Sequence, residues 1–302
     1  MLEHCWTSGL TRRGLAPRLP VPTIYLNPPY ERTAQLFGAD IRKIRQYLTV
    51  QNRWPRFLYK YKNLDHDHLR DLIVDSCLYM SSRHQLNDPF DVRSNIDFVD
   101  GGVDRRAYLD YLFKQFKTRY KDRKEIAQRL SSPAVIQAEL RRHLNNAMDS
   151  TGFHSFATDP RSLLMWSHYA DSHKGVCLVF ETAKDVDTFV HALPVQYSKN
   201  FPVVQFTTTV ARDLIRKAFL TKAEEWKYEK ERRIVEQKRA GQSLSYKPQA
   251  LIAIVLGAKI SSADKEIVLG LLDARRTRGY PPLCLLHAVC QESAYAVRIN
   301  RA

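Results

Sequence analysis

The chain has 302 residues, of which 44% are hydrophobic and 11% aromatic, which is enough to bury a substantial core and excludes an intrinsically disordered protein. Its longest apolar run, Leu251 to Leu256, is far shorter than the roughly 20 residues of a membrane span. The N-terminus lacks the basic-then-apolar order of a signal peptide. We therefore expect a folded cytoplasmic protein without a membrane segment.

Positive charge dominates the surface chemistry, because Lys and Arg exceed Asp and Glu by 47 to 32, a formal net charge of +15. Such a charge favours nucleic acid or another polyanion as a partner. It is concentrated between Arg105 and Arg142, where Lys and Arg alternate with Tyr and Phe. Aromatic residues at these spacings are more typical of the buried stripe of a helix than of a platform on which bases stack.

The cysteines are odd in number and form no Cys-x-x-Cys pair, which argues against a disulfide framework and against a thiolate zinc site. A cytoplasmic location would keep them reduced. We expect reduced and mostly buried thiols at Cys5, Cys77, Cys177, Cys284 and Cys290.

The first 30 residues are rich in Pro and Arg and show no periodicity, so we expect a flexible arm before a single domain over residues 31–302. A helical insertion is expected at about 104–149, where Ser132 and Pro133 supply a cap and a first-turn proline for its second helix. The elements expected in this half are helices at Glu31–Val50 and Asp67–Asp75, strands at Arg56–Lys62 and Leu78–Ser82, and the insertion's helices at Arg105–Leu130 and Pro133–Met148.

From Gly152 onward strands predominate. Strand and helix alternate without a regular βαβ rhythm, which favours an α+β fold over a doubly wound sheet. The expected strands are Gly152–Ala157, Lys174–Phe180, Leu193–Tyr197, Arg232–Glu236, Leu251–Leu256 and a final hairpin of Leu283–Val289 with Tyr295–Ile299; the expected helices are Ser162–Tyr169, Thr207–Thr221 and Ser262–Arg276, the last capped by Ser261 or Ser262.

Two carboxylates stand two residues apart in the segment Trp226–Val235, at Glu229 and Glu231, where a charged helix gives way to a strand. Side chains alternate faces in an extended chain, so the two would lie on one face about 7 Å apart. They would form a carboxylate pair at a strand end, beside the aromatic wall of Trp226 and Tyr228. The other interpretation is a solvated helix with surface salt bridges, the usual meaning of a Glu/Lys/Arg run.

Two further segments concentrate polar groups. Ser162–Gly175 contains His168 and His173, whose spacing does not match a zinc helix, and no nucleophile-elbow motif surrounds its serines. A hydrogen-bonded, partly buried His168 is the simpler interpretation. Asn87–Asp91 predicts a loop folded back through Asx hydrogen bonds, either structural or facing a ligand.

Five motifs follow one another along the chain. They are LYKYKNL at Leu58–Leu64, LYMSSRHQLNDPFD at Leu78–Asp91, GFHSFA at Gly152–Ala157, LLMWSHYADSHKGVCLVF at Leu163–Phe180 and TKAEEWKYEKERRIV at Thr221–Val235. In this order they resemble the bacterial domain of unknown function 2971 family. The resemblance covers roughly Arg56 to Gly257, and the arrangement looks like the ADP-ribosyltransferase fold. This resemblance implies a split, mixed or antiparallel β core that binds NAD, with an inserted helical pair and a catalytic Glu at the start of a late strand.

The resemblance implies that Glu231 is the catalytic carboxylate, which would stabilise the oxocarbenium-like ribose as nicotinamide leaves. Glu229 would orient or deprotonate the acceptor. NAD is then a substrate and no metal is expected. Where such transferases carry Ser-Thr-Ser this chain has Ser81-Ser82, and where they carry a first-strand Arg or His it has Tyr59 or Tyr61. The NAD-binding residues implied are Tyr59, Tyr61, Ser81, Ser82, Asn87, Trp166, His168 and Tyr228.

The function expected from this resemblance is an effector or phage-defence toxin that transfers ADP-ribose to a cytoplasmic macromolecule or nucleotide, with an antitoxin or immunity protein as partner. One alternative is a non-enzymatic, basic nucleic-acid-binding module, in which Glu229 and Glu231 only form salt bridges. The bridges would then go to Arg232, Arg233 or Lys227. Another alternative is a metal-dependent nuclease that uses Asp88, Asp91, His168 and Glu231.

Overall fold

The computed structural model describes residues 54–64, 67–93, 95–97, 105–115, 118–205 and 217–301. The arm expected at residues 1–30 and the helix expected at Glu31–Val50 lie outside the described residues. So does most of the helix expected at Thr207–Thr221, of which residues 217–219 are described as helical. Within the described part of the chain the fold is mixed α+β, as the sequence predicts.

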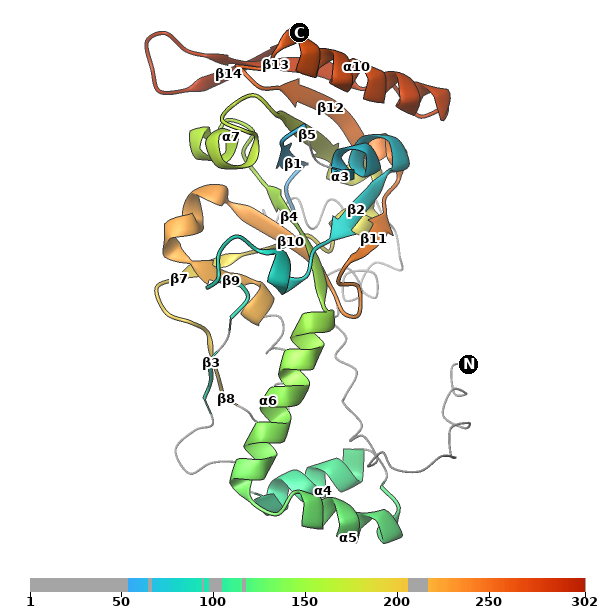
Figure 1. The fold of residues 1–302 in the computed structure, drawn as a ribbon, viewed down its shortest axis with the longest axis vertical. Coiled ribbons are helices and arrows are strands. Elements are labelled where there is room, and N and C mark those ends of the chain that lie inside the picture. The colour runs from blue at the N-terminus through green and yellow to red at the C-terminus, as the bar shows by residue number, and fades with distance from the viewer. Residues whose placement is uncertain are drawn as a thin grey trace.

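An eight-stranded sheet of mixed orientation forms the centre of the fold (Figure 1). Neighbouring strands pair antiparallel except β12 and β13, which are parallel. The sequence predicts all of these strands, although β6 is only the first part of one of them. In spatial order they are β14 (Val297–Arg301), β13 (Cys284–Cys290), β12 (Leu251–Leu256), β5 (Val176–Glu181), β1 (Phe57–Lys62), β4 (Gly152–Ala157), β10 (Glu231–Glu236) and β6 (Leu193–Pro194).

The strand expected at Leu193–Tyr197 is divided between two sheets. The N–H of Val195 donates to the carbonyl of Glu231 in the main sheet, whereas the N–H of Gln196 donates to the carbonyl of Leu220. The chain therefore changes sheets between these two residues. The two-stranded sheets are β2 (Cys77–Met80) with β11 (Gln242–Ser245), β3 (Asn95–Asp97) with β8 (Val203–Gln205), and β7 (Gln196–Ser198) with β9 (Thr221–Ala223).

The main sheet opens between β1 and β4. Tyr59 pairs with Ala157 and no further pair follows between these strands, although β1 pairs with β5 along its whole length. Beyond Tyr59 the ammonium of Lys60 donates to the carbonyl of Ser155 at 2.7 Å, which replaces a lost ladder bond. The far end of β4 is bridged instead to Ser81, directly after β2. One edge of β4 is thus shared by two segments with an opening between them.

Alternate residues of the strands pack against opposite faces of the sheet. Leu58 and Ile254 join a core covered by α10 (Ser262–Thr277), which Ser261 caps, and by α3 (Asp67–Arg70) with the π-helical turn Asp71–Asp75. Tyr61 and Val255 face the other way, toward α7 (Leu163–Tyr169). The remaining short segments are η2 (Arg83–Gln85), η3 (Thr182–Lys184), α8 (Val186–Phe189), η4 (Glu224–Glu229) and η5 (Pro248–Ala250).

The helical insertion projects from the sheet along α6 (Pro133–Ser150), with α4 (Arg105–Gln115) and α5 (Tyr120–Arg129) at its far end (Figure 1). The single helix expected at Arg105–Leu130 is wrong, because the chain becomes extended at Arg119. A continuous helix would span nearly 40 Å over 25 residues, so its two ends would lie too far apart to touch. In the structure residues from both ends pack together in a small core. That core contains Tyr108, Leu109, Leu112, Leu130 and Ile136, and Arg105 donates to the carbonyls of Ala127 and Leu130.

None of the helices in the described ranges has both the length and the apolar character needed to cross a membrane. The four described cysteines are free thiols. The expectation that they are mostly buried is wrong for this part of the chain, since Cys177 is buried while Cys284 and Cys290 are exposed at the two ends of β13.

Candidate functional site

A cavity of about 420 Å³ lies where β1 parts from β4. Its size is typical of sites for small molecules and cofactors. One wall comes from β1 and β4, the second from the loop 81–91, the third from α7, and the fourth from residues 222–233. The charged groups that line it are Lys60, Lys62, Asp91, Lys222, Glu229, Glu231 and Arg233, and the imidazole of His168 also lines it.

A reversal at Lys230 brings Glu229 and Glu231 to this cavity. The helical turn η4 ends at Lys230, which has φ 46° and ψ 49°, and β10 begins at the next residue. The two carboxylates converge through this left-handed residue, rather than through the strand alternation that the sequence suggests. Glu229 is 3% and Glu231 6% exposed, so the interpretation of the segment as a solvated helix is wrong.

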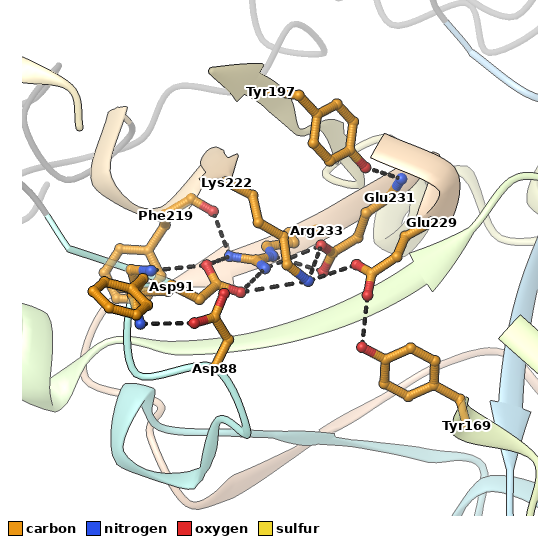
Figure 2. A network of polar contacts seen from close by, with 11 residues as sticks. Asp88, Asp91, Tyr169, Tyr197, Phe219, Lys222, Glu229, Glu231 and Arg233 are labelled. Atoms are coloured by element: carbon orange, nitrogen blue, oxygen red, sulfur yellow. Dashed lines mark hydrogen bonds and ion pairs between the residues drawn. The ribbon is translucent and has the colours of Figure 1, made fainter. Parts of the chain in front are cut away.

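Arg233 holds Glu231 in place (Figure 2). Its Nε and Nη2 donate to the two oxygens of Glu231 at 2.7 and 3.0 Å. Nη1 and Nη2 also donate to the two oxygens of Asp91 at 2.9 and 2.5 Å, and Nη1 donates to the carbonyl of Phe219. All five N–H donors of the guanidinium are therefore used. The two parallel hydrogen bonds from Arg233 to the carboxylate of Glu231 form a bidentate pair, which fixes the orientation of Glu231.

The ammonium of Lys222 lies among three carboxylates (Figure 2). It is 2.5 Å from Glu229, 3.4 Å from Glu231 and 3.6 Å from Asp91. Glu229 also accepts a hydrogen bond of 2.6 Å from the hydroxyl of Tyr169. Burial lowers the pKa of Lys222, but the charges of Glu231 and Glu229 outweigh burial, so the net pKa is raised and the ammonium stays charged.

The surroundings push the pKa values of the two glutamates apart. Burial tends to raise the pKa of Glu231, but the charges of Arg233 and Lys222 dominate and hold it at about 2. Burial raises the pKa of Glu229, and the nearby charge of Glu231 adds to that effect. Divergent pKa values in neighbouring carboxylates are the mark of distinct acid–base roles. Glu231 is a permanent anion, whereas Glu229 can take up a proton.

Two lysines of β1, Lys60 and Lys62, line the same cavity as the glutamates. Burial lowers the pKa of Lys60 to about 7, and the charge of Lys62 contributes. Burial likewise lowers the pKa of Lys62 to about 8. Within the described ranges neither ammonium has a carboxylate at ion-pair distance, although buried charges are normally paired. These lysines therefore suit an anionic ligand.

The structure brings together five of the residues expected to bind NAD and separates three. Tyr59, Tyr61, Ser81, Asn87 and His168 line the cavity. Outside its lining lie Ser82, which caps η2; Trp166, which is fully buried with its indole N–H on the carbonyl of Pro160; and Tyr228, which lies beside Trp226.

The sequence interpretation missed several residues of the site, mainly Lys60, Lys62, Tyr169 and Lys222. The alternation of LYKYKNL at Leu58–Leu64 was a usable signal, because a strand that carries tyrosines on one face carries lysines on the other. Nothing local marks Lys222, which reaches the glutamates only through the fold.

The segment Ser162–Gly175 is explained largely by packing. Asp171, Ser172 and His173 all have positive φ, and the following Gly175 lies so close to β1 that an added Cβ would be 2.2 Å from the carbonyl of Lys62. Of its polar side chains, His168 and Tyr169 line the cavity. The density of polar residues therefore reflects a tight turn more than a reactive centre.

The structure bears on both alternative functions, the metal-dependent nuclease and the nucleic-acid-binding module. In the described part of the chain no group of three or more His, Cys, Asp or Glu side chains could hold a metal ion, so Asp88, Asp91, His168 and Glu231 do not assemble the metal site that a nuclease would need. The salt bridge expected between Glu231 and Arg233 is present, and it is buried rather than exposed.

Residues 165–234 match the model of a family described as a protein of unknown function (DUF2971). This supports the resemblance to that family drawn from the sequence motifs, and the matched segment contains Tyr169, Lys222, Glu229, Glu231 and Arg233. Comparison with curated proteins and with solved structures gave no match. The family description states no activity, so function has to be argued from the site.

Proposed function

We propose that the chain is an enzyme that binds NAD in this cavity and transfers its ADP-ribose to an acceptor. The observation that carries the proposal is the pair Glu229 and Glu231, two buried carboxylates of divergent pKa on the wall of a cavity at an opening in the sheet. The sequence resemblance to the ADP-ribosyltransferase fold independently assigns the same two residues.

Glu231 supplies the fixed negative charge. The bond between the ribose C1′ and the nicotinamide nitrogen breaks, and its electron pair leaves with nicotinamide. The ribose carbon becomes oxocarbenium-like, and a carboxylate held beside it lowers the barrier without reorganising. Arg233 serves as a positioning residue, because it keeps Glu231 ionised and oriented, and Asp91 holds the guanidinium of Arg233 in place.

Glu229 serves the acceptor. The acceptor's nucleophilic atom forms a new bond to C1′ and loses a proton, which the carboxylate of Glu229 accepts as a general base. A raised pKa suits this task, because base strength rises with pKa. Tyr169 and Lys222 set the direction of the carboxylate.

Lys60 and Lys62 line the cavity from β1 and suit the diphosphate of NAD. An anion there would supply the counter-charge that the two ammonium groups lack among the described residues. In the proposed role as an effector or defence toxin, NAD consumption or target modification would inhibit growth, and an antitoxin or immunity protein would hold the enzyme in check.

The test uses NAD labelled separately in nicotinamide and in adenine, incubated with purified protein and a cell extract. We expect release of labelled nicotinamide and transfer of the adenine label to an acceptor or to water. Glu231→Gln should lower both, whereas the matched control Glu225→Gln, an exposed glutamate of the preceding turn η4, should not.

Wild-type protein that neither binds nor consumes NAD would refute the proposal. Retained, salt-sensitive binding of nucleic acid by such a protein would favour the non-enzymatic alternative.

A further inference from the structure

A second cavity, of about 230 Å³, adjoins the carboxylate site. Lys222 lines both cavities, and its ammonium contacts Glu229 and Glu231 in the first. A group bound in the second cavity would therefore lie next to the proposed reacting centre. The other lining residues are Phe90, Arg93, Ser198, Lys199, Asn200, Phe201, Pro202, Thr221 and Ala223.

Two aromatic rings stand exposed at this cavity. Phe90 is 59% and Phe201 37% exposed, and their ring centroids are 6.4 Å apart with a 34° angle between planes. The guanidinium of Arg93 lies 5.6 Å over the ring of Phe90. Exposed aromatic faces beside cations are the combination with which proteins bind the bases and phosphates of single strands.

The turn that carries Phe90 holds it rigidly outward. The N–H of Phe90 donates to the carboxylate of Asp88 at 2.8 Å, and Arg233 holds the next side chain, Asp91, inside the protein. Val92 has φ 52°, which is unusual for a β-branched residue. The surrounding structure therefore fixes the backbone at Val92 in a conformation that the residue itself disfavours. Because the ring of Phe90 is already held in place, its binding to a ligand does not carry the entropy cost of ordering a mobile loop.

We propose that this second cavity is the acceptor site and that the acceptor is a nucleobase, in single-stranded nucleic acid or in a free nucleotide. Its use as an acceptor site rests on the proposed function. Phe90 and Phe201 stack on the base, and Arg93 and Lys199 contact its phosphate. The net charge of +15 favours this polyanion over an uncharged or basic peptide.

In the transfer step a nitrogen of the base forms the bond to the ribose C1′. The bond from C1′ to nicotinamide breaks, its electron pair leaves with nicotinamide, and the proton lost from the base nitrogen passes to Glu229. No oxidant, reductant or metal is needed.

The first experiment measures binding without NAD, so that its outcome does not depend on the proposed transfer chemistry. A fluorescent single-stranded oligonucleotide is titrated with protein, and anisotropy gives the dissociation constant; an unlabelled mononucleotide competes in a second arm. Phe90→Ala and Phe201→Ala should each weaken binding about 5-fold to 150-fold, the range for loss of one stacked base. Tyr295→Ala is the matched control, because Tyr295 is fully exposed on another turn.

Two variants separate stacking from mere apolar contact. Phe90→Trp should retain binding, and the oligonucleotide should quench the new indole emission. Phe90→Leu should bind almost as weakly as Phe90→Ala. Removing the charge of Arg93 or Lys199 with Gln should lower the slope of log K against log salt by about 0.7 each. Competition by the mononucleotide at similar affinity would identify a free nucleotide as the acceptor, and much weaker competition would identify a strand.

The proposal fails if wild-type protein binds neither ligand at low salt, or if the two Phe→Ala variants bind as wild type does. Equal binding by Phe90→Leu and wild type would also overturn it, in favour of an apolar protein partner.

Discussion

Replacing Glu231 by Gln should cost far more stability than the loss of a surface ion pair. Its carboxylate makes contacts of 2.7, 3.0 and 3.4 Å with Arg233 and Lys222. Removing one partner of a buried pair costs about 3 to 5 kcal/mol. The pKa gives a consistent figure, since a shift from 4.5 to about 2 corresponds to about 3 kcal/mol at neutral pH.

At about 2 to 4 °C per kcal/mol for a chain of this size, a loss of about 3 kcal/mol should lower the melting temperature of Glu231→Gln by roughly 6 to 12 °C. The rate of NAD cleavage should fall about 10²-fold to 10³-fold, as for loss of one preorganised electrostatic group. The two losses need separating, because an unfolded enzyme is also inactive.

The assay is therefore run well below the variant's melting temperature, with the folded fraction measured by circular dichroism. Ile254→Ala is the matched control, because it removes a fully buried side chain of β12 and should cost about 2 to 5 kcal/mol without lowering the rate per folded molecule. A melting temperature within 2 °C of wild type, or a full rate in folded Glu231→Gln, would refute the electrostatic argument.

The depressed pKa of Glu231 also fixes the sign of a pH effect. A folded pKa below the unfolded one contributes stability that is present above pH 4.5 and lost as pH falls toward about 2. Wild type should therefore lose more stability than Glu231→Gln between pH 5 and pH 2, as urea unfolding at each pH would show. Parallel curves would contradict the pairing of Glu231 with Arg233.

Three further outcomes follow from the geometry. Glu229→Gln should destabilise less than Glu231→Gln at pH 7, because the pKa of Glu229 is raised and its ionisation already opposes folding above pH 4.5; equal losses of melting temperature would contradict this. Lys62→Met should raise the melting temperature at pH 7 and weaken NAD binding in calorimetry. The gain should shrink as pH rises above about 8, where Lys62 of the folded wild type loses its proton, and disappear near the unfolded pKa of 10.5; an unchanged difference at pH 10 would contradict it. Gly257→Ala should destabilise by about 3 kcal/mol, because its Cβ would lie 2.1 Å from the carbonyl of His173. In contrast Gly270→Ala, in open space on α10, should stabilise the protein by about 0.5 to 1 kcal/mol. Denaturant unfolding measures the free energy of both variants, and a stabilised Gly257→Ala or a destabilised Gly270→Ala would contradict the prediction.

Local sequence patterns predict the elements whose formation depends on local chemistry. Ser132 and Pro133 start α6 as expected, and alternation or apolar runs indicate β1, β4 and β12. The break before Tyr120 has no local signal, because it exists to let α4 pack back on α5 and α6.

In the candidate site, too, some features can be predicted from the local sequence and others depend on the tertiary structure. The pattern Glu-x-Glu draws attention to Glu229 and Glu231, but their neighbours are set by tertiary structure. Lys222 and Asp91 reach them from other segments, and the left-handed Lys230, which makes the carboxylates converge, has no glycine or asparagine to signal it.

The contact between Arg233 and Asp91 joins positions 142 residues apart, which bears on how the protein is made. At about 5 to 20 residues per second, a ribosome needs roughly 7 to 28 seconds to synthesise the intervening chain. During that interval Asp91 exists without its partner, and the carboxylate network cannot form. The site therefore assembles only after β10 has been synthesised, so in the nascent chain the network appears once Arg233 has left the ribosome and can reach Asp91.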